Sequence, residues 1–198
     1  MVNTHTLSSE TADTLLKVAM RRLMMEDKAA KIKTLILDVD GVLTDGRITI
    51  NDRGEEIKSF HARDGLGLRL LMNAGIDVII ITGRKSEVVA HRARELGIKE
   101  VYQGIKDKGA LCKKLMKQKQ LEKDQLCCIG DDLPDLPVFH LAGLSIAVAD
   151  AATEVRHAAG IITKNEGGKG AVREACEIIL KTRKTWEEAL SSFMKKKN

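Results

Sequence analysis

The chain has 198 residues, of which 43% are hydrophobic and 3% aromatic, and its 33 basic and 28 acidic residues leave a formal net charge of +5. This length suits one domain with a full core. The modest, dispersed charge and the scarcity of aromatic side chains predict no nucleic-acid partner, because single-stranded nucleic acid binds to aromatic platforms in a basic groove.

Residues 1–30 carry apolar side chains at helical spacing but no long apolar run. They predict an amphipathic N-terminal helical segment that is neither a signal sequence nor a membrane span, so we expect no membrane partner. We expect the folded domain to occupy residues 31–182. Residues 183–198 predict a C-terminal helical tail, and its final run Lys195-Lys196-Lys197 is expected to be solvated.

Short apolar strands alternate with helical stretches from Lys33 onward. Strands are expected near Thr34, Val78, Val101, Leu126 and Ser145, and helices near Leu68, Val88, Leu111, Val138 and Val155. This alternation predicts an α/β fold, a Rossmann-like, doubly wound parallel sheet with helices on both faces. Residues 47–60 depart from it and predict an inserted β-hairpin with Gly54 in its turn. The segments between the motifs described below leave no room for a separate cap domain.

The cysteines show no Cys-x-x-Cys spacing, and two of them are adjacent in an expected core strand. They are Cys112, Cys127, Cys128 and Cys176. Such residues behave as small apolar side chains in a reduced protein, so we expect a cytoplasmic location and no zinc site.

Two acidic clusters follow predicted buried strands. Asp38 and Asp40 come directly after the strand near Thr34, and Asp131, Asp132 and Asp135 follow the strand near Leu126. Ligands of α/β sheets bind at the carboxyl ends of the strands. Acidic side chains crowded there repel each other unless a cation lies between them, and uncompensated buried acids are costly. A hard divalent ion with oxygen ligands, most simply Mg²⁺, is therefore expected.

A hydroxyl and an ammonium group are expected at the same edge. Thr82 ends the apolar strand near Val78, and Lys108 begins a helical stretch. A carboxylate at such an edge can act as a nucleophile, which divides one difficult step into two. Asp38 suits the nucleophile, and Asp40, two residues on, suits the general acid and base. Thr82 can donate a hydroxyl there, and Lys108 supplies an ammonium group that can balance negative charge.

These residues, in this order, resemble the four motifs of the haloacid dehalogenase superfamily of Mg²⁺-dependent phosphotransferases. The matching residues are Asp38 and Asp40 in Asp-x-Asp-Gly-Val, Thr82, Lys108, and Asp131-Asp132 with Asp135. The resemblance implies a phosphatase domain of the haloacid dehalogenase type. It also implies a metal held by Asp38, the backbone carbonyl of Asp40 and Asp131, with Asp132 and Asp135 orienting ligands and waters.

Further motifs narrow the resemblance to the phosphatases of acidic sugar phosphates in that superfamily, with 3-deoxy-D-manno-octulosonate 8-phosphate and lipopolysaccharide biosynthesis as the implied substrate and pathway. These motifs are residues 37–46, Arg63-Asp64-Gly65, Thr82-Gly83-Arg84-Lys85 and residues 167–174. Lys169 stands where the family pattern has arginine. A phosphate together with a carboxylate calls for several cations. The expected substrate-binding residues are Asp40, His61, Ala62, Arg63, Asp64, Gly65, Arg69, Arg84, Arg92 and Lys108.

Members of the superfamily without a cap commonly close the site with a neighbouring subunit. The resemblance therefore implies a homo-oligomer, specifically a homotetramer. The hairpin of residues 47–60 carries Ile48, Ile50, Ile57 and Phe60, and this apolar surface suits contacts between subunits.

Several alternatives remain open at this point. The substrate could be a nine-carbon keto-deoxy or neuraminate 9-phosphate. A signalling receiver domain also places acids, a threonine and a lysine at strand ends, although its acid pair precedes the phosphoacceptor. Asp135 could cap a helix. Residues 167–170 could bind an anion through backbone N–H groups at a helix start, or could simply form a flexible loop.

Overall fold

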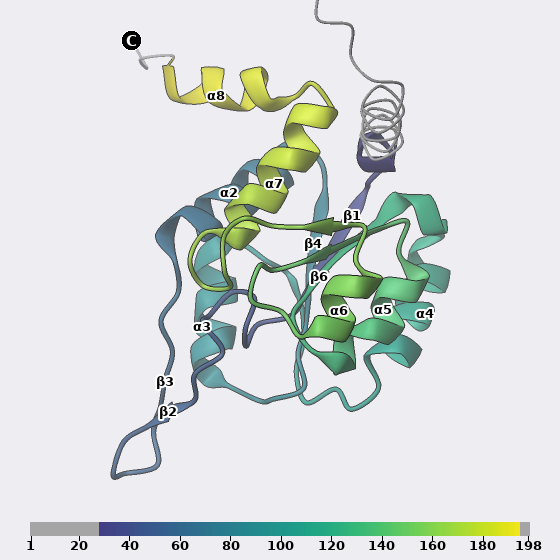
Figure 1. Ribbon diagram of the computed structural model, residues 1–198. Coiled ribbons are helices and arrows are strands. Elements are labelled where there is room, and N and C mark those ends of the chain that lie inside the picture. The colour runs from purple at the N-terminus through teal and green to yellow at the C-terminus, as the bar shows by residue number, and fades with distance from the viewer. Residues whose placement is uncertain (1–27, 195–198) are drawn as a thin grey trace, which may run out of the picture.

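A computed structural model describes residues 28–194, and Figure 1 shows their arrangement. The central sheet has six strands in the order β5-β4-β1-β6-β7-β8, and all its pairings are parallel. The strands are β1 Thr34–Leu37, β4 Asp77–Ile81, β5 Glu100–Tyr102, β6 Leu126–Gly130, β7 Leu144–Ala147 and β8 Ile161–Ile162. The predicted doubly wound α/β fold is confirmed.

Helices cover both faces of the sheet. In Figure 1, α2, α3 and α7 lie on one side of it and α4, α5 and α6 on the other. The helices are α2 Ala62–Asn73, α3 Glu87–Leu96, α4 Lys108–Lys119, α5 Leu136–Leu141, α6 Thr153–Ala158, α7 Ala171–Thr182 and α8 Trp186–Met194, with the 3-10 turns η1 Lys123–Gln125 and η2 Leu133–Asp135. None of the helices within residues 28–194 is long and apolar enough to cross a membrane.

The core lies where these helices meet the central strands. Every residue of β1 and β6 is buried, as are Val78–Ile81 of β4. Strands covered on both faces read as continuous apolar runs, which is why these segments were recognisable. β8 was not predicted. It has two residues at the edge of the sheet, and so short a segment carries no periodic signal.

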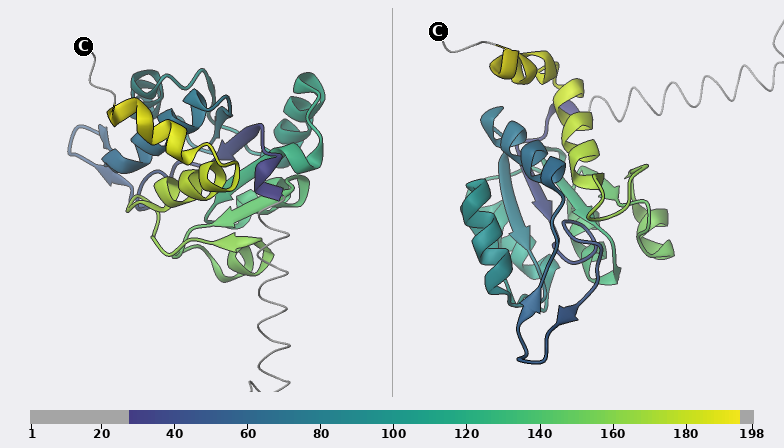
Figure 2. Two further views of the ribbon diagram at one scale, coloured as in Figure 1. Left: turned by 90° about the horizontal axis from the view of Figure 1, so that it is seen from above. Right: turned by 90° about the vertical axis from the view of Figure 1, so that its left-hand side faces the viewer.

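The inserted hairpin is present but shorter than expected. Its strands β2 Thr49–Ile50 and β3 Glu56–Ile57 pair antiparallel, and Gly54 has a φ of +77° in the connection. The hairpin extends away from the body, beyond the carboxyl ends of the sheet strands, as Figures 1 and 2 show. A two-stranded ribbon without a packed face is marginal in water, so regular pairing is confined to its middle.

The terminal segments are described only in part. The predicted helix over residues 1–30 lies almost wholly outside the described residues, and so does the run Lys195-Lys196-Lys197. α8 falls within the predicted C-terminal helical tail. Trp186, its first residue, lies under the Arg173 guanidinium and the Lys181 ammonium of α7, at 5.3 and 5.1 Å from its ring centre. The division into residues 31–182 and 183–198 stays a prediction.

Candidate active site

The two acidic clusters meet at the carboxyl edge of the sheet. β1 and β6 are parallel neighbours with Leu37 opposite Ile129, so Asp38 and Asp131 emerge side by side. One carboxylate oxygen from each of Asp38, Asp131 and Asp135 lies within 4.8 Å of the others. The predicted convergence of both clusters is therefore observed.

Lys108 joins this group from the first turn of α4. Its side chain is 5% exposed, and its Nζ lies 3.1 Å from Asp38 Oδ1 and 2.7 Å from Asp135 Oδ1. Burial acts to lower the pKa of Lys108, but the two carboxylates outweigh it and raise that pKa. The ammonium group is thus held charged next to Asp38.

Asp135 is occupied entirely by donors of the protein. Its Oδ1 accepts from Lys108, and its Oδ2 accepts from the backbone N–H groups of Asp131 and Asp132 at 3.0 and 3.4 Å. Asp132 caps the short turn η2 through the N–H group of Leu133 at 2.8 Å. The capping alternative for Asp135 is wrong at α5, because Asp135 precedes that helix but its side chain accepts no capping hydrogen bond there. Its carboxylate instead completes the capping box that Asp132 begins at η2, while also holding Lys108.

The remaining carboxylates fit a divalent cation. Asp131 Oδ1 is buried and has no hydrogen-bond donor among residues 28–194. Burial, followed by repulsion from Asp135, Asp38 and Asp132, raises the pKa of Asp131 to about 8. Burial likewise raises the pKa of Asp38 to about 6, against the opposing effect of Lys108. Buried carboxylates that lack enough protein donors are the ligand set that a hard cation such as Mg²⁺ prefers.

Two glycines allow the loops around the acidic residues to approach each other closely. Gly41 has a φ of +94°, and a Cβ there would lie 2.0 Å from Asp131 Oδ2. Gly167 packs onto the same loop, because a Cβ on it would lie 1.7 Å from the carbonyl oxygen of Gly41. A side chain at either position would displace the loop that follows Asp38.

The loop of residues 167–170 therefore supports the first motif, and the anion alternative is not supported. The N–H of Gly167 donates to Asp150 Oδ1 at 2.9 Å. The N–H of Gly168 donates to the carbonyl of Val42 at 3.0 Å, and the N–H of Lys169 to that of Glu166 at 3.1 Å. These groups are not available to a ligand. Lys169, which replaces the arginine of the family pattern, pairs with Glu166 at the surface.

Thr82 directly follows β4, the strand next to β1. Leu37 pairs with Ile80, so Thr82 follows β4 at the level of the first acidic motif. Its backbone is fixed on both sides, since its N–H donates to Tyr102 at 2.9 Å and its carbonyl accepts from Ile105 at 3.1 Å. The structure thus brings Thr82 to the same edge as Asp38.

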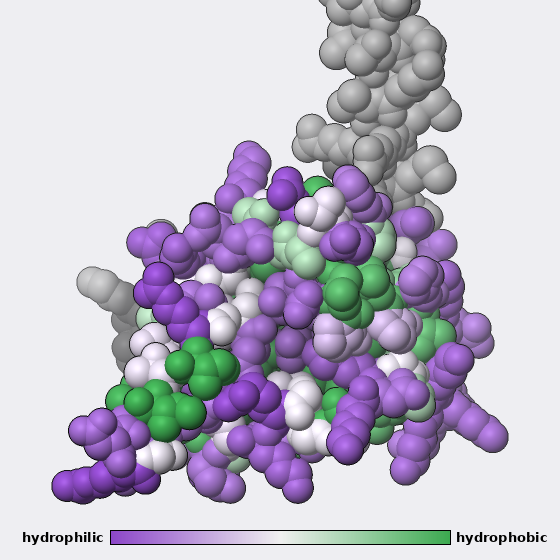
Figure 3. Space-filling model, turned by 60° about the horizontal axis from the view of Figure 1, so that its bottom comes forward, coloured by the Kyte–Doolittle hydropathy of each residue, from purple (hydrophilic) through white to green (hydrophobic). Residues whose placement is uncertain are grey.

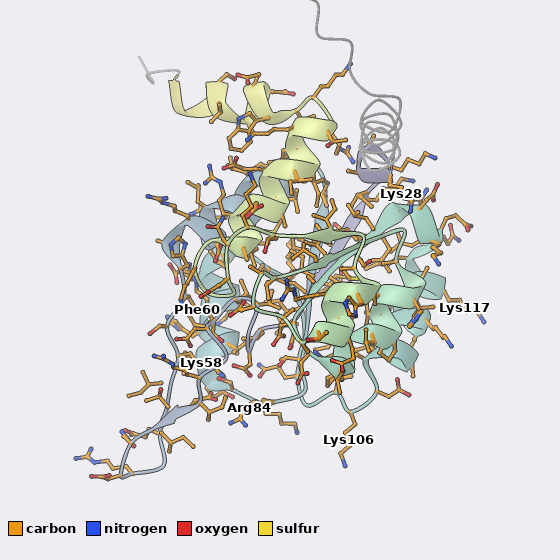
Figure 4. All side chains as sticks on the ribbon, viewed as in Figure 1. Lys28, Lys58, Phe60, Arg84, Lys106 and Lys117 are labelled. Atoms are coloured by element: carbon orange, nitrogen blue, oxygen red, sulfur yellow. The ribbon has the colours of Figure 1, made fainter. Side chains whose placement is uncertain are left out.

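Asp40 faces the hairpin rather than Lys108. Its carboxylate forms an ion pair with Lys58, which follows β3 directly, and its Oδ2 lies 3.9 Å from Arg84 Nε. Figure 4 shows Lys58 and Arg84 at the base of the hairpin. The sequence prediction missed Lys58 and its neighbour Glu56. Their spacing of two, on either side of exposed Ile57, was the only signal that both point inward.

The start of α2 carries several predicted pocket residues. His61 precedes the helix, and its Nδ1 lies 3.9 Å from Asp64 Oδ2. Asp64 is buried, which raises its pKa, and its Oδ1 accepts the N–H of Arg173 at 2.7 Å. Asp64 thereby provides a hydrogen-bond acceptor for a backbone N–H group in the first turn of α7, which has no partner within the helix. Ala62 is exposed beside it.

The four predicted arginines lie in different surroundings. Arg84 contacts Asp40, as described above. Arg92 of α3 pairs with Glu95 at 2.8 Å and lies 5.7 Å from the Phe60 ring centre. A Cβ on Gly65 would lie 2.4 Å from Arg92 Nη2, so Gly65 leaves room for that guanidinium. Arg63 and Arg69 are exposed on α2.

Comparisons with known proteins agree with this geometry. A family model described as haloacid dehalogenase-like hydrolase matches residues 97–175. The chain belongs to this family, and it is a phosphoric monoester hydrolase. The signalling receiver alternative is thereby set aside.

Within the family, the chain is similar to 3-deoxy-D-manno-octulosonate 8-phosphate phosphatases. It is 48% identical to that enzyme of Yersinia pestis over 77% of this chain and 82% of the relative. The crystal structure of the enzyme from Moraxella catarrhalis, in complex with a magnesium ion, a phosphate ion and a KDO molecule, is 43% identical with a TM-score of 0.83, covering 85% of this chain and 97% of the other. The cobalt-bound Haemophilus influenzae enzyme is 44% identical with a TM-score of 0.80, and the match covers 85% of this chain and 99% of the other. The narrower resemblance drawn from the motifs is confirmed.

Proposed function

We propose that this protein hydrolyses 3-deoxy-D-manno-octulosonate 8-phosphate to the free sugar acid and inorganic phosphate, a step of lipopolysaccharide biosynthesis. The observation that carries the proposal is the group of Asp38, Asp131, Asp135 and Lys108 at the sheet edge. The named specificity of the relatives supports the substrate. The free, buried cysteines support a reducing, cytoplasmic location.

Asp38, the backbone carbonyl of Asp40 and Asp131 would hold Mg²⁺. The orphaned Oδ1 of Asp131 supports this assignment, as does the magnesium ion in the related structure. Asp135 is left to hold Lys108 and the loop after β6. When bound, Mg²⁺ supplies positive charge that offsets repulsion between the carboxylate nucleophile and the phosphate dianion.

In the proposed reaction, Asp38 attacks phosphorus and forms an aspartyl-phosphate as the bond to the sugar oxygen breaks. Asp40 protonates that oxygen and later takes a proton from the water that hydrolyses the intermediate. Lys108, 3.1 Å from Asp38, balances charge on the transferring group. Thr82 donates its hydroxyl to a phosphoryl oxygen, and Asp132 orients water at the site.

The substrate carboxylate and hydroxyls would contact residues around this centre. We assign them to His61, Ala62, Arg63, Asp64, Gly65, Arg69, Arg84 and Arg92. Arg84 is the best supported of the arginines, because it lies beside Asp40 with a side chain 49% exposed. A guanidinium in that position can turn from Asp40 and Glu56 toward a ligand carboxylate.

Replacing Arg84 with Ala tests the substrate class. We expect kcat/KM for the eight-carbon sugar acid phosphate to fall roughly a hundredfold, the size of a lost charge-assisted hydrogen bond, while a small aryl phosphate is affected much less. Arg94→Ala is the matched control, because Arg94 is exposed on α3. Equal losses on both substrates would assign Arg84 to the phosphate or to structure. Faster turnover of a nine-carbon acid or a neutral sugar phosphate by the parent enzyme would overturn the proposed substrate.

The proposal includes a homotetramer, supported by the exposed hairpin. Ile48, Ile50 and Ile57 are 44%, 58% and 53% exposed. In Figure 3, hydrophobic side chains are exposed at the lower left, on the hairpin side of the molecule, and other hydrophobic groups lie on the right of the view. Light scattering should give a mass of several 21.8-kDa chains, and the double substitution of Ile50 and Ile57 by Asp should lower it. Ile162→Asp, on the edge strand β8, is the control. A fully active parent monomer would contradict the assembly.

A further inference from the structure

Lys58 carries a buried ammonium group that the reaction described above does not use. Its side chain is 1% exposed, although it lies at the base of a protruding hairpin. Its Nζ forms ion pairs with Asp40 and, at 3.1 Å, with Glu56 Oε1. An ammonium group is buried in this way only when charges compensate it.

A second cation closes the same network. Arg84 lies 3.9 Å from Asp40 Oδ2 and 3.5 Å from Glu56 Oε1. The two cations differ in exposure, since Arg84 is half exposed whereas Lys58 is enclosed. Arg84 can therefore turn toward a ligand through solvent, while the Lys58 side chain is enclosed beside Asp40 and Glu56.

The backbone direction of the hairpin places Lys58 in this position. Successive side chains of an extended segment point to opposite sides. Ile57 faces solvent at 53% exposure, and Glu56 and Lys58 on either side of it face the first motif. The hairpin thus places the ion pair of Lys58 and Glu56 beside the loop that carries Asp40.

Each acid of the first motif pairs with a different buried lysine. Lys108 contacts Asp38 and Asp135, and Lys58 contacts Asp40 and Glu56. We propose that Lys58 is a positioning residue that holds the Asp40 carboxyl group at the leaving oxygen of the substrate. This inference rests on the proposed function, in which Asp40 is the general acid.

The chemistry of the leaving group makes the inference testable. The oxygen of an alkyl phosphate, such as a sugar phosphate, leaves as a poor alkoxide unless it is protonated, whereas p-nitrophenolate leaves without a proton. A misplaced acid therefore slows phosphoryl transfer from alkyl phosphates and spares p-nitrophenyl phosphate. The constant kcat/KM reports this first step and excludes the later hydrolysis of the intermediate.

The experiment compares Lys58→Met with the parent on three substrates: the eight-carbon sugar acid phosphate, a neutral sugar phosphate and p-nitrophenyl phosphate. We expect kcat/KM to fall roughly a hundredfold on both sugar phosphates and less than about threefold on p-nitrophenyl phosphate. Arg84→Ala should differ from Lys58→Met, because its loss of kcat/KM should be confined to the sugar acid phosphate. Lys58→Arg should recover part of the activity on alkyl phosphates. Lys117→Met, which removes an exposed lysine of α4, is the matched control.

Asp40→Asn separates this inference from the proposed function. If Asp40→Asn shows the same dependence on the leaving group and Lys58→Met does not, Lys58 does not position the acid and the inference is overturned. If Asp40→Asn loses activity equally on alkyl and aryl phosphates, Asp40 is not the acid, and both proposals fail. Should Lys58→Met not fold, Glu56→Gln weakens the same anchor and should reproduce the preference for p-nitrophenyl phosphate; equal kcat/KM losses on all three substrates would refute the positioning role.

Discussion

Replacing Asp38 with Asn is expected to lower kcat by at least roughly a thousandfold while the protein stays folded. An amide has nearly the shape of the carboxylate but cannot attack phosphorus. Lys108 keeps its contact with Asp135 at 2.7 Å, so it is not left as an unpaired buried charge. Phosphate release from the sugar acid phosphate measures the loss, and thermal unfolding confirms the fold.

Asp77→Asn is the matched control, because Asp77 begins β4 at the opposite end of the sheet and is exposed. Its turnover should equal that of the parent. Acid quenching of the parent during turnover should trap phosphate on Asp38, identified by mass spectrometry. Parent-like rates in Asp38→Asn would rule out the nucleophile and with it the aspartyl-phosphate.

The second large effect is expected at Asp131. Its pKa is raised from the ordinary 3.8 to about 8, chiefly by burial. Between pH 3.8 and about pH 8, Asp131 of the folded, metal-free protein holds a proton that the same residue of the unfolded chain releases. The free energy of unfolding therefore falls as the pH rises through this range. Mg²⁺ competes with that proton. Stabilisation by Mg²⁺ should therefore grow between about pH 6 and pH 8 and then level off.

Thermal unfolding with and without Mg²⁺ across this pH range measures both effects. In Asp131→Asn, the destabilisation with rising pH should shrink, and calorimetric titration should show Mg²⁺ binding weakened by at least roughly a hundredfold. Asp132→Asn is a useful comparison, because Asp132 is exposed and caps η2, so its Mg²⁺ affinity should change far less. A variant of Asp131 that titrates with Mg²⁺ as the parent does would remove Asp131 from the metal site.

The sequence by itself determined the sheet and the position of the acidic clusters. Residues 34–37 and 126–130 are strands buried on both faces, so their apolar runs mark their ends to the residue. Parallel pairing then brings the residues after each strand to one edge. Asp38, Thr82 and Asp131 could be assigned to one site for this reason alone, before any side-chain contact was known.

Only the tertiary structure decided which residues from other segments contact the acidic residues and their loops at the carboxyl edge of the sheet. Lys58 reaches Asp40 because the second strand of the hairpin returns to the body beside the first motif, and Asp64 accepts the N–H of Arg173 across 109 positions of the chain. Gly167 is required by a close approach to Gly41 from a distant loop. Contacts of this kind depend on the three-dimensional path of several segments, and no local spacing, propensity or periodicity encodes them.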